Sequence, residues 1–127
     1  MNIYTHKKID SILCGEPTLL EKGYSRVEFH ATDIMKVDEY GLIHGGFVFG
    51  LADYSAMLAV NHPNVVLGSA TVKFLKPVKA GDFIVAEGRV VTEEGKKQKV
   101  VVTVKKGEDK VFEGEFICFV LNKHVLE

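Results

Sequence analysis

Residues 38–61 read DEYGLIHGGFVFGLADYSAMLAVN, and this stretch decides the fold. A polar loop passes at Gly45 and Gly46 into an apolar run that continues to Asn61. The run predicts a helix that is apolar nearly all round, which is typical of a helix enclosed by other structure. Asp53 is the one acid within this run, and burying a lone carboxylate is costly. Asp53 is therefore the first candidate for chemistry.

The helix face that carries Asp53 also carries two glycines. Gly46, Gly50, Asp53 and Met57 follow one another at spacings of four, three and four residues, which places them on one side of the helix. Each glycine costs about 1 kcal/mol relative to alanine inside a helix. That cost is reasonable if a ligand or another backbone approaches the face closely. At the helix start, free N–H groups can hold an anion or a developing oxyanion.

Composition limits the classes of function. The 127 residues predict a single domain spanning 1–127, and the net charge of −1 gives no basic footprint for nucleic acid. Residues 1–10 lack the apolar core of a signal peptide, and no run is apolar enough to span a membrane. The five histidines are too scattered to suggest a zinc site. We therefore expect a reduced, cytoplasmic protein without metal.

The remaining sequence predicts one short helix and a series of strands. Residues 4–13 carry apolar residues at near-helical spacing and lead to Gly15, a natural helix stop. Alternating polar and apolar residues predict a long strand over residues 18–31. Short glycine-containing turns imply antiparallel neighbours, so the fold class is α+β, one sheet against one central helix. The further strands are predicted over residues 65–78, 83–92, 97–106 and 111–121.

In this order, the motifs resemble the hotdog-fold acyl-CoA thioesterases, most nearly the phenylacetate-pathway (PaaI-type) group. The likeness rests on residues 41–46 (GLIHGG), residues 51–53 (LAD), Asn61 and residues 74–77 (FLKP) followed by Gly81-Asp82. Together these motifs are fairly specific, whereas an HGG tripeptide alone would be weak. The resemblance implies a curved antiparallel sheet of five to six strands wrapped around one long helix. It also implies paired subunits with active sites at their interface.

The resemblance implies roles for individual residues. Asp53, nine residues after the histidine of HGG, matches the family's catalytic carboxylate. The backbone amide of Gly45, with Gly46 beside it at the helix start, would donate to the thioester carbonyl, and His44 would shape the site. The candidate substrate-binding residues are Ser69 and Thr71, whose hydroxyls would position water, and Phe47 and Met57, which would form part of an apolar pocket wall.

One residue departs from the family pattern. The family commonly has an asparagine six residues before the histidine, where this chain has Asp38. An ionised aspartate cannot donate a hydrogen bond. Asp38 could be protonated, could leave the donor role to another residue, or could itself be the catalytic acid, as in the 4-hydroxybenzoyl-CoA branch of the fold.

These residues suit thioester hydrolysis on chemical grounds as well. Asp53 could activate water as a general base or attack as a nucleophile. Amides at the helix start could stabilise the oxyanion, at roughly 3–4 kcal/mol per donor in other systems. No cofactor is needed, because coenzyme A is part of the substrate. We therefore expect an acyl-CoA thioesterase that acts as a dimer or tetramer, with no nucleic-acid or membrane partner.

Other readings stay open at this point. Asp53 could be a structural acid bonded to backbone amides or to a partner subunit. The chain could be an acyl-CoA sensor without turnover, although a pure binder has no need of the acid. It could also be a hydroxyacyl-thioester dehydratase with Asp38 and His44 as its acid–base pair. The acyl chain, and the choice of coenzyme A over acyl carrier protein, are not fixed by the sequence.

Overall fold

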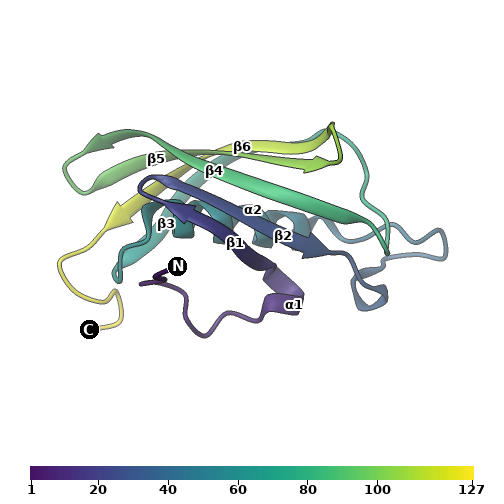
Figure 1. Cartoon of the computed structure of the whole chain (residues 1–127), viewed down its shortest axis with the longest axis horizontal. Coiled ribbons are helices and arrows are strands. Elements are labelled where there is room, and N and C mark those ends of the chain that lie inside the picture. The colour runs from purple at the N-terminus through teal and green to yellow at the C-terminus, as the bar shows by residue number, and fades with distance from the viewer.

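A six-stranded antiparallel sheet curves around one long helix (Figure 1). The computed structural model describes residues 1–127. The long helix is α2 (Gly45–Val60), which begins and ends within a residue of its predicted bounds. The other elements, in chain order, are α1 (Ser11–Cys14), β1 (Glu16–Glu21), β2 (Tyr24–His30), the 3-10 turn η1 (Asp33–Met35), β3 (Val65–Phe74), β4 (Phe83–Glu94), β5 (Lys97–Lys106) and β6 (Asp109–Val120). The predicted hotdog architecture is confirmed.

The strand order in the sheet is β1-β2-β4-β5-β6-β3. The strand that follows α2 therefore lies at one edge, next to the last strand of the chain. Most of β3 is exposed, and its outer edge pairs with no strand of this chain. A strand of ten residues with a free edge can pair with another chain.

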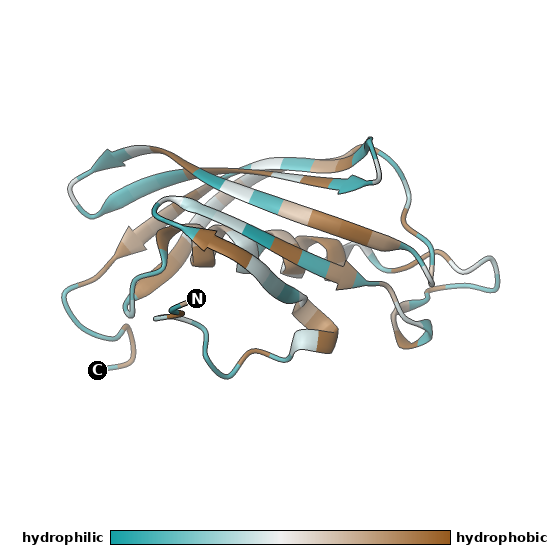
Figure 2. Cartoon of the chain, in the orientation of Figure 1, coloured by the Kyte–Doolittle hydropathy of each residue, from teal (hydrophilic) through white to brown (hydrophobic).

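Helix α2 lies against β4, β2 and β5 on the concave side of the sheet (Figure 1). Its ribbon is largely brown in Figure 2, since nearly every residue is apolar, and nine of its sixteen residues are buried. The helix and the inward side chains of the strands form one core cluster of 24 residues. Phe29, Phe112 and Phe116 are the largest side chains that are completely enclosed in it.

Two buried serines fasten the helix to the sheet. The Ser25 hydroxyl on β2 donates to the Ser55 carbonyl oxygen of α2 at 2.6 Å, and the two hydroxyl oxygens are 2.8 Å apart. Gly88 on β4 lies directly beneath this contact, because a Cβ there would be 2.9 Å from the Ser55 carbonyl oxygen. The helix therefore approaches the sheet closely at this point, and no side chain fits at residue 88.

The predicted helix over residues 4–13 is wrong in extent, because only Ser11–Cys14 is helical. Asp10 caps this short turn by accepting from the Ile12 and Leu13 N–H groups, which makes residue 11 the start. The preceding segment is instead tied to the end of α2. Asn61, in the left-handed conformation with φ 51°, accepts from the Tyr4 N–H and donates to the Asn2 carbonyl oxygen.

The single long strand predicted over residues 18–31 is also wrong. The chain turns at Gly23, whose φ of 73° suits a glycine, and returns as the β1–β2 hairpin. The sheet therefore has six strands, within the predicted range of five to six.

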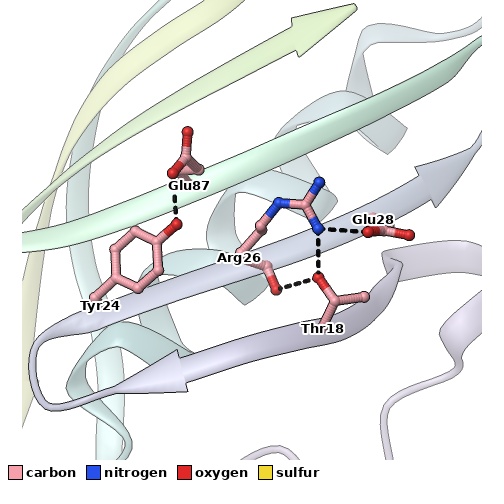
Figure 3. Close-up of polar contacts among 5 residues, drawn as sticks. All are labelled: Thr18, Tyr24, Arg26, Glu28 and Glu87. Carbon is pink, nitrogen blue, oxygen red and sulfur yellow. Dashed lines mark hydrogen bonds and ion pairs between the residues drawn. The ribbon is translucent and has the colours of Figure 1, made fainter. Parts of the chain in front are cut away.

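The convex face of the sheet is polar. Ser25, Val27 and Phe29 of β2 point to the helix, so the residues between them point away from it. There Tyr24 donates to Glu87, and Arg26 pairs with Glu28 and bonds Thr18 (Figure 3). Side chains bonded to one another along this face leave the apolar side of the sheet to the helix.

Candidate active site

The first turn of α2 is capped by the histidine that precedes it. His44 Nδ1 accepts a hydrogen bond from the Gly46 N–H at 2.8 Å. Because Nδ1 accepts, the neutral imidazole carries its proton on Nε2 and can donate from there. A Cβ at residue 46 would be 2.8 Å from His44 Nδ1, so this glycine makes room for the imidazole ring.

The two glycines at the helix start differ in what their amides do. The Gly46 N–H is occupied by His44, whereas the Gly45 N–H has no partner within the chain. Beside Gly45 stands the Phe74 ring from the end of β3, 3.2 Å from where a Cβ at residue 45 would lie. The Gly45 amide, which the resemblance names as the donor, is therefore free for a ligand, whereas the Gly46 amide is not.

Asp53 lies in the second turn after this start, and its carboxyl group is largely buried. Its Oδ1 atom has no hydrogen-bond partner, and Thr32 Oγ1 is the one other buried side-chain oxygen in that state. Burial raises the pKa of Asp53 from 3.8 to about 6. The reading of Asp53 as a structural acid bonded to backbone amides of its own chain is therefore not supported. A free carboxylate oxygen with a raised pKa suits a base near neutral pH.

The helix face between the start and Asp53 is left open by the sheet. Gly46 is exposed, Gly50 and Asp53 are half-buried, and a Cβ at Gly50 would meet nothing within 4 Å. The face closes only at Met57, which is 1% exposed. The predicted close approach at Gly50 is therefore not made by any part of this chain.

Asp38 has a structural role in the loop before α2. Its Oδ1 accepts from the Tyr40 N–H at 3.0 Å and from the Leu42 N–H at 3.3 Å. The same carboxylate is exposed, and the structure forms no hydrogen bond between it and His44. The geometry therefore gives the loop-capping role of Asp38 direct support.

The two candidate hydroxyls on β3 lie on the other side of the sheet from α2. Thr71 pairs with Glu115 and Ser69 with Ile117, whereas the inward residues of β6 are Phe116 and Cys118. Directly paired residues on adjacent strands point to the same side. Within one chain, neither hydroxyl is brought to Asp53.

The remaining candidate side chains surround the helix. Phe47 is half-buried and packs edge-on to the His44 ring at 6.3 Å. Met57 is buried one turn after Asp53. Burial and then the charges of Asp10 and Asp53 raise the pKa of Cys14, and burial with a smaller effect of Asp53 raises that of Cys118 to about 12. Both thiols therefore stay protonated near the carboxylate.

A cavity beside Gly45 is lined by neither Phe47 nor Met57, the residues expected to form part of an apolar pocket wall. Its volume is about 310 Å³, and the segment from Phe74 to Val78 forms one wall of it. The signal in the sequence was the FLKP motif, which marks where the chain leaves β3, but pattern alone does not place that motif against the helix start. The histidines do not gather with other ligands into any group of three that could hold a metal ion. No helix is long and apolar enough to cross a bilayer.

Two longer proteins contain a region similar to this chain. It is 55% identical over 121 residues to an Aquifex aeolicus protein named methylthioribose-1-phosphate isomerase, and 95% of the chain spans 26% of that protein. It is 31% identical over 127 residues to the transcription factor FapR of Caldanaerobacter subterraneus, and 96% of the chain spans 64% of that protein. The chain thus matches less than two thirds of each.

Two solved structures share the fold over nearly the whole chain. An uncharacterized protein from Pyrococcus horikoshii is 55% identical, with a TM-score of 0.99 covering 100% of this chain and 98% of that one. A Streptococcus mutans protein bound to acetyl CoA is 27% identical, with a TM-score of 0.81 covering 95% and 98%. A family model described as "Thioesterase superfamily" matches residues 40–113, from the loop before α2 into β6. The chain belongs to the thioesterase superfamily.

Proposed function

We propose that this protein hydrolyses acyl-CoA thioesters to a free acid and coenzyme A, with Asp53 activating water. The observation that carries the proposal is the Asp53 carboxyl group, whose Oδ1 atom is buried without a hydrogen-bond partner, one turn after the open position at Gly50. A carboxylate held in this way lowers the stability of the fold, and a role in catalysis would explain why the chain carries it.

The protonation state of Asp53 fits the role of base. With a pKa of about 6, the group is mostly ionised at pH 7 and yet more basic than an exposed aspartate. It would take a proton from water as the oxygen attacks the thioester carbonyl. The C–S bond would then break, and the proton would pass to the coenzyme A thiolate, which leaves as the thiol. We expect kcat/KM to fall as the pH drops through about 6, because protonation removes the base.

The helix start would stabilise the oxyanion. The free Gly45 N–H is the backbone donor, reinforced by the positive end of the α2 dipole. His44, with its proton on Nε2, is a second possible donor, and it would fill the role for which Asp38 is unsuited while it accepts two loop amides.

These parts act on one carbonyl only if two copies pair. Asp53 follows Gly45 by eight residues, which is about 12 Å along a helix. No single carbonyl can contact both groups of the same helix. We propose a dimer in which α2 helices run antiparallel across their open faces, so that Asp53 of one copy meets Gly45 of the other. Gly50, with no neighbour in its own chain, would allow the helices to approach.

The comparisons support this class of substrate. Membership of the thioesterase superfamily favours thioester chemistry, and the similar Streptococcus mutans protein was solved bound to acetyl CoA. Water and the thioester are the only reactants that the proposed step needs. A cytoplasmic location is part of the proposal, since coenzyme A thioesters would be met there.

The test is release of free coenzyme A thiol from acyl-CoAs by wild type, Asp53→Asn and Asp38→Asn. We expect Asp53→Asn to lose at least about a hundredfold in kcat, the lower range for a general base, and Asp38→Asn to keep most activity. Asp33→Asn is the matched control, because that carboxylate is 84% exposed. Full activity of Asp53→Asn would refute the proposal, and loss only at Asp38 would move the acid to the loop.

A second candidate is an acyl-CoA sensor without turnover. The similarity to the transcription factor FapR favours it, because that name describes regulation rather than catalysis. Calorimetry would separate the two. A sensor would bind an acyl-CoA tightly and release no thiol. Its Asp53→Asn variant would bind the same acyl-CoA equally well.

A dehydratase using Asp38 and His44 gains no support from the geometry. Each group is engaged with a backbone amide of the loop or helix start. Loss of enoyl-CoA absorbance on hydration would reveal such an activity in the same samples.

A further inference from the structure

We infer that the cavity beside Gly45 holds the acyl group of the substrate and selects short to medium chains without a terminal charge. This inference rests on the proposed function, since it assumes that the thioester carbonyl is bound at the Gly45 N–H. It goes beyond that function by naming the class of acyl group.

The cavity adjoins the proposed oxyanion donor. Gly45 and Val48, one turn apart on α2, form its helical side. The loop after β3 and Val111, near the start of β6, form the opposite side. The apolar side chains that line it include Leu42, Ile43, Val48, Phe74, Leu75 and Val111. A carbonyl at the Gly45 amide would therefore have an apolar wall within reach of its substituent.

Three backbone N–H groups of the lining are already hydrogen-bonded within the chain. The Leu75 and Lys76 N–H groups both donate to the Val111 carbonyl oxygen, at 2.8 and 3.3 Å, and the Ile43 N–H donates to the Val78 carbonyl oxygen at 3.0 Å. The pantetheine arm of coenzyme A carries two amides that need partners when they leave water. A hydrocarbon chain needs none, so the cavity suits the acyl side of the thioester better than the carrier side.

The one charge at the cavity is already paired at the surface. Lys76 is the only charged residue of the lining, and its Nζ lies 3.3 Å from the Asp109 carboxylate. An acyl group ending in a carboxylate would have to compete with Asp109 for this ammonium group, while its other surroundings are apolar. Such a group would lose its hydration without gaining a free partner.

The volume of the cavity, as one copy forms it, gives a scale for the acyl chain. About 310 Å³ is at the low end of the roughly 300–1,000 Å³ of small-molecule pockets. If each methylene-sized group takes about the 30 Å³ share of a water molecule, roughly ten such groups fit. Octanoyl is within that limit and hexadecanoyl exceeds it. Phe74, 56% exposed, borders the cavity with its ring beside Gly45, where the thioester carbonyl is proposed to bind.

The experiment measures kcat/KM for acetyl-, butyryl-, octanoyl-, hexadecanoyl- and succinyl-CoA. For wild type, kcat/KM should rise from acetyl-CoA to octanoyl-CoA and fall at hexadecanoyl-CoA. Succinyl-CoA should be at least tenfold poorer than butyryl-CoA, which matches it without the terminal carboxylate. A preference for succinyl-CoA, or no dependence on chain length, would overturn the inference.

Two variants move the cavity size in opposite directions. Phe74→Ala should raise the ratio of hexadecanoyl to butyryl activity about tenfold, and Leu75→Phe should lower the ratio of octanoyl to butyryl activity by a similar factor. Phe83→Ala is the matched control, because Phe83 is a comparably exposed phenylalanine that packs on His30 instead. It should leave both ratios unchanged.

The outcomes separate this inference from the proposed function. If Phe74→Ala raises KM equally for every chain length, the cavity holds the carrier and the inference fails while hydrolysis stands. If no acyl-CoA is hydrolysed, the proposed function fails. Dissociation constants for the same acyl-CoA panel then test whether the cavity holds the acyl group. Dissociation constants that depend on chain length, and change in the Phe74→Ala and Leu75→Phe variants, would still support the inference. Dissociation constants without this dependence would refute the inference.

Discussion

At the scale of the residue, Asp53 makes stability depend on pH. Its carboxyl group has a pKa of about 6 when folded and 3.8 as the ordinary value. The folded state therefore binds the proton more tightly, and the free energy of unfolding falls as the pH rises from about 4 to 6. Asp53→Asn removes this effect, so we expect it to stabilise the protein at pH 7 by about 1–3 kcal/mol.

Thermal unfolding of wild type and Asp53→Asn at pH 4 and pH 7 checks this prediction. The gain in unfolding temperature of Asp53→Asn over wild type should be large at pH 7. It should be small at pH 4, where the wild-type carboxyl is already protonated. An equal change at both values would mean that the carboxylate is not strained by burial.

The histidine cap gives a second residue-scale prediction. A methyl group at residue 46 would displace the His44 ring, so Gly46→Ala and His44→Ala should remove the same contact. We expect each to lower kcat several-fold, and the double variant to be little worse than either, because coupled changes are not additive. If the loss of kcat in the double variant equals the product of the two single losses, the two residues act separately.

The sequence predicted Asp53 and the glycine face because both conflict with an ordinary buried helix. The pattern alone did not distinguish Gly45 from Gly46, although the resemblance named the Gly45 amide as the donor. That distinction depends on the His44 side-chain torsions, which place Nδ1 on one amide and leave the other free. Local pattern does not encode a rotamer.

At the scale of the element, the attachment of α2 to the sheet is tested by Gly88. An added Cβ would lie 2.9 Å from the Ser55 carbonyl oxygen, which is backbone and cannot turn away. We expect Gly88→Ala to destabilise the fold by about 1–3 kcal/mol, as overpacked cores do. Urea unfolding measures this.

Ser25→Ala tests the same attachment from the other strand. It would leave the buried Ser55 carbonyl without this donor, for an expected cost of about 1–3 kcal/mol. Thr92→Ala, at an exposed position of β4, is the control and should change stability by less than about 0.5 kcal/mol. Equal costs at Ser25 and Thr92 would contradict a fastening role.

Element bounds followed the sequence closely where periodicity was long, as in α2 and β5. They failed before Gly15, where tertiary contacts decide. Asn2 and Tyr4 bond to Asn61, 59 and 57 positions away, so this segment is not free to begin the predicted helix. The β1–β2 turn was missed because Gly23 suits a bend within a strand as well as a hairpin.

At the scale of the whole molecule, the open helix face and the free edge of β3 predict a dimer. Because a side chain at Gly50 meets nothing in its own chain, Gly50→Arg should leave the single chain folded. It should nevertheless convert the dimer to monomers and abolish thiol release, since the proposed site needs both copies. Analytical ultracentrifugation, circular dichroism and the hydrolysis assay together check this.

Thr92→Arg is the control for added charge and should stay dimeric and active. A wild-type protein that is monomeric and fully active would refute the paired site. Sequence patterns implied the fold and, through the resemblance, the pairing. They could not say that the cavity-forming loop after β3 comes to rest beside the helix start.

The Asn61 bonds to the first residues have a practical consequence. They hold the amino terminus at the end of α2, and the carboxyl terminus emerges on the same side of the molecule (Figure 1). The helix start lies sixteen residues, or about 24 Å, away. A fluorophore, affinity tag or fused protein attached at either terminus would therefore be remote from the Gly45 end of its own copy. In the proposed antiparallel dimer, however, Gly45 of one copy is opposite Asp53 of the other, and Asn61 is only eight residues, or about 12 Å, farther along the helix. Tethered forms for surface-bound assays would therefore need a linker long enough to clear the partner's site.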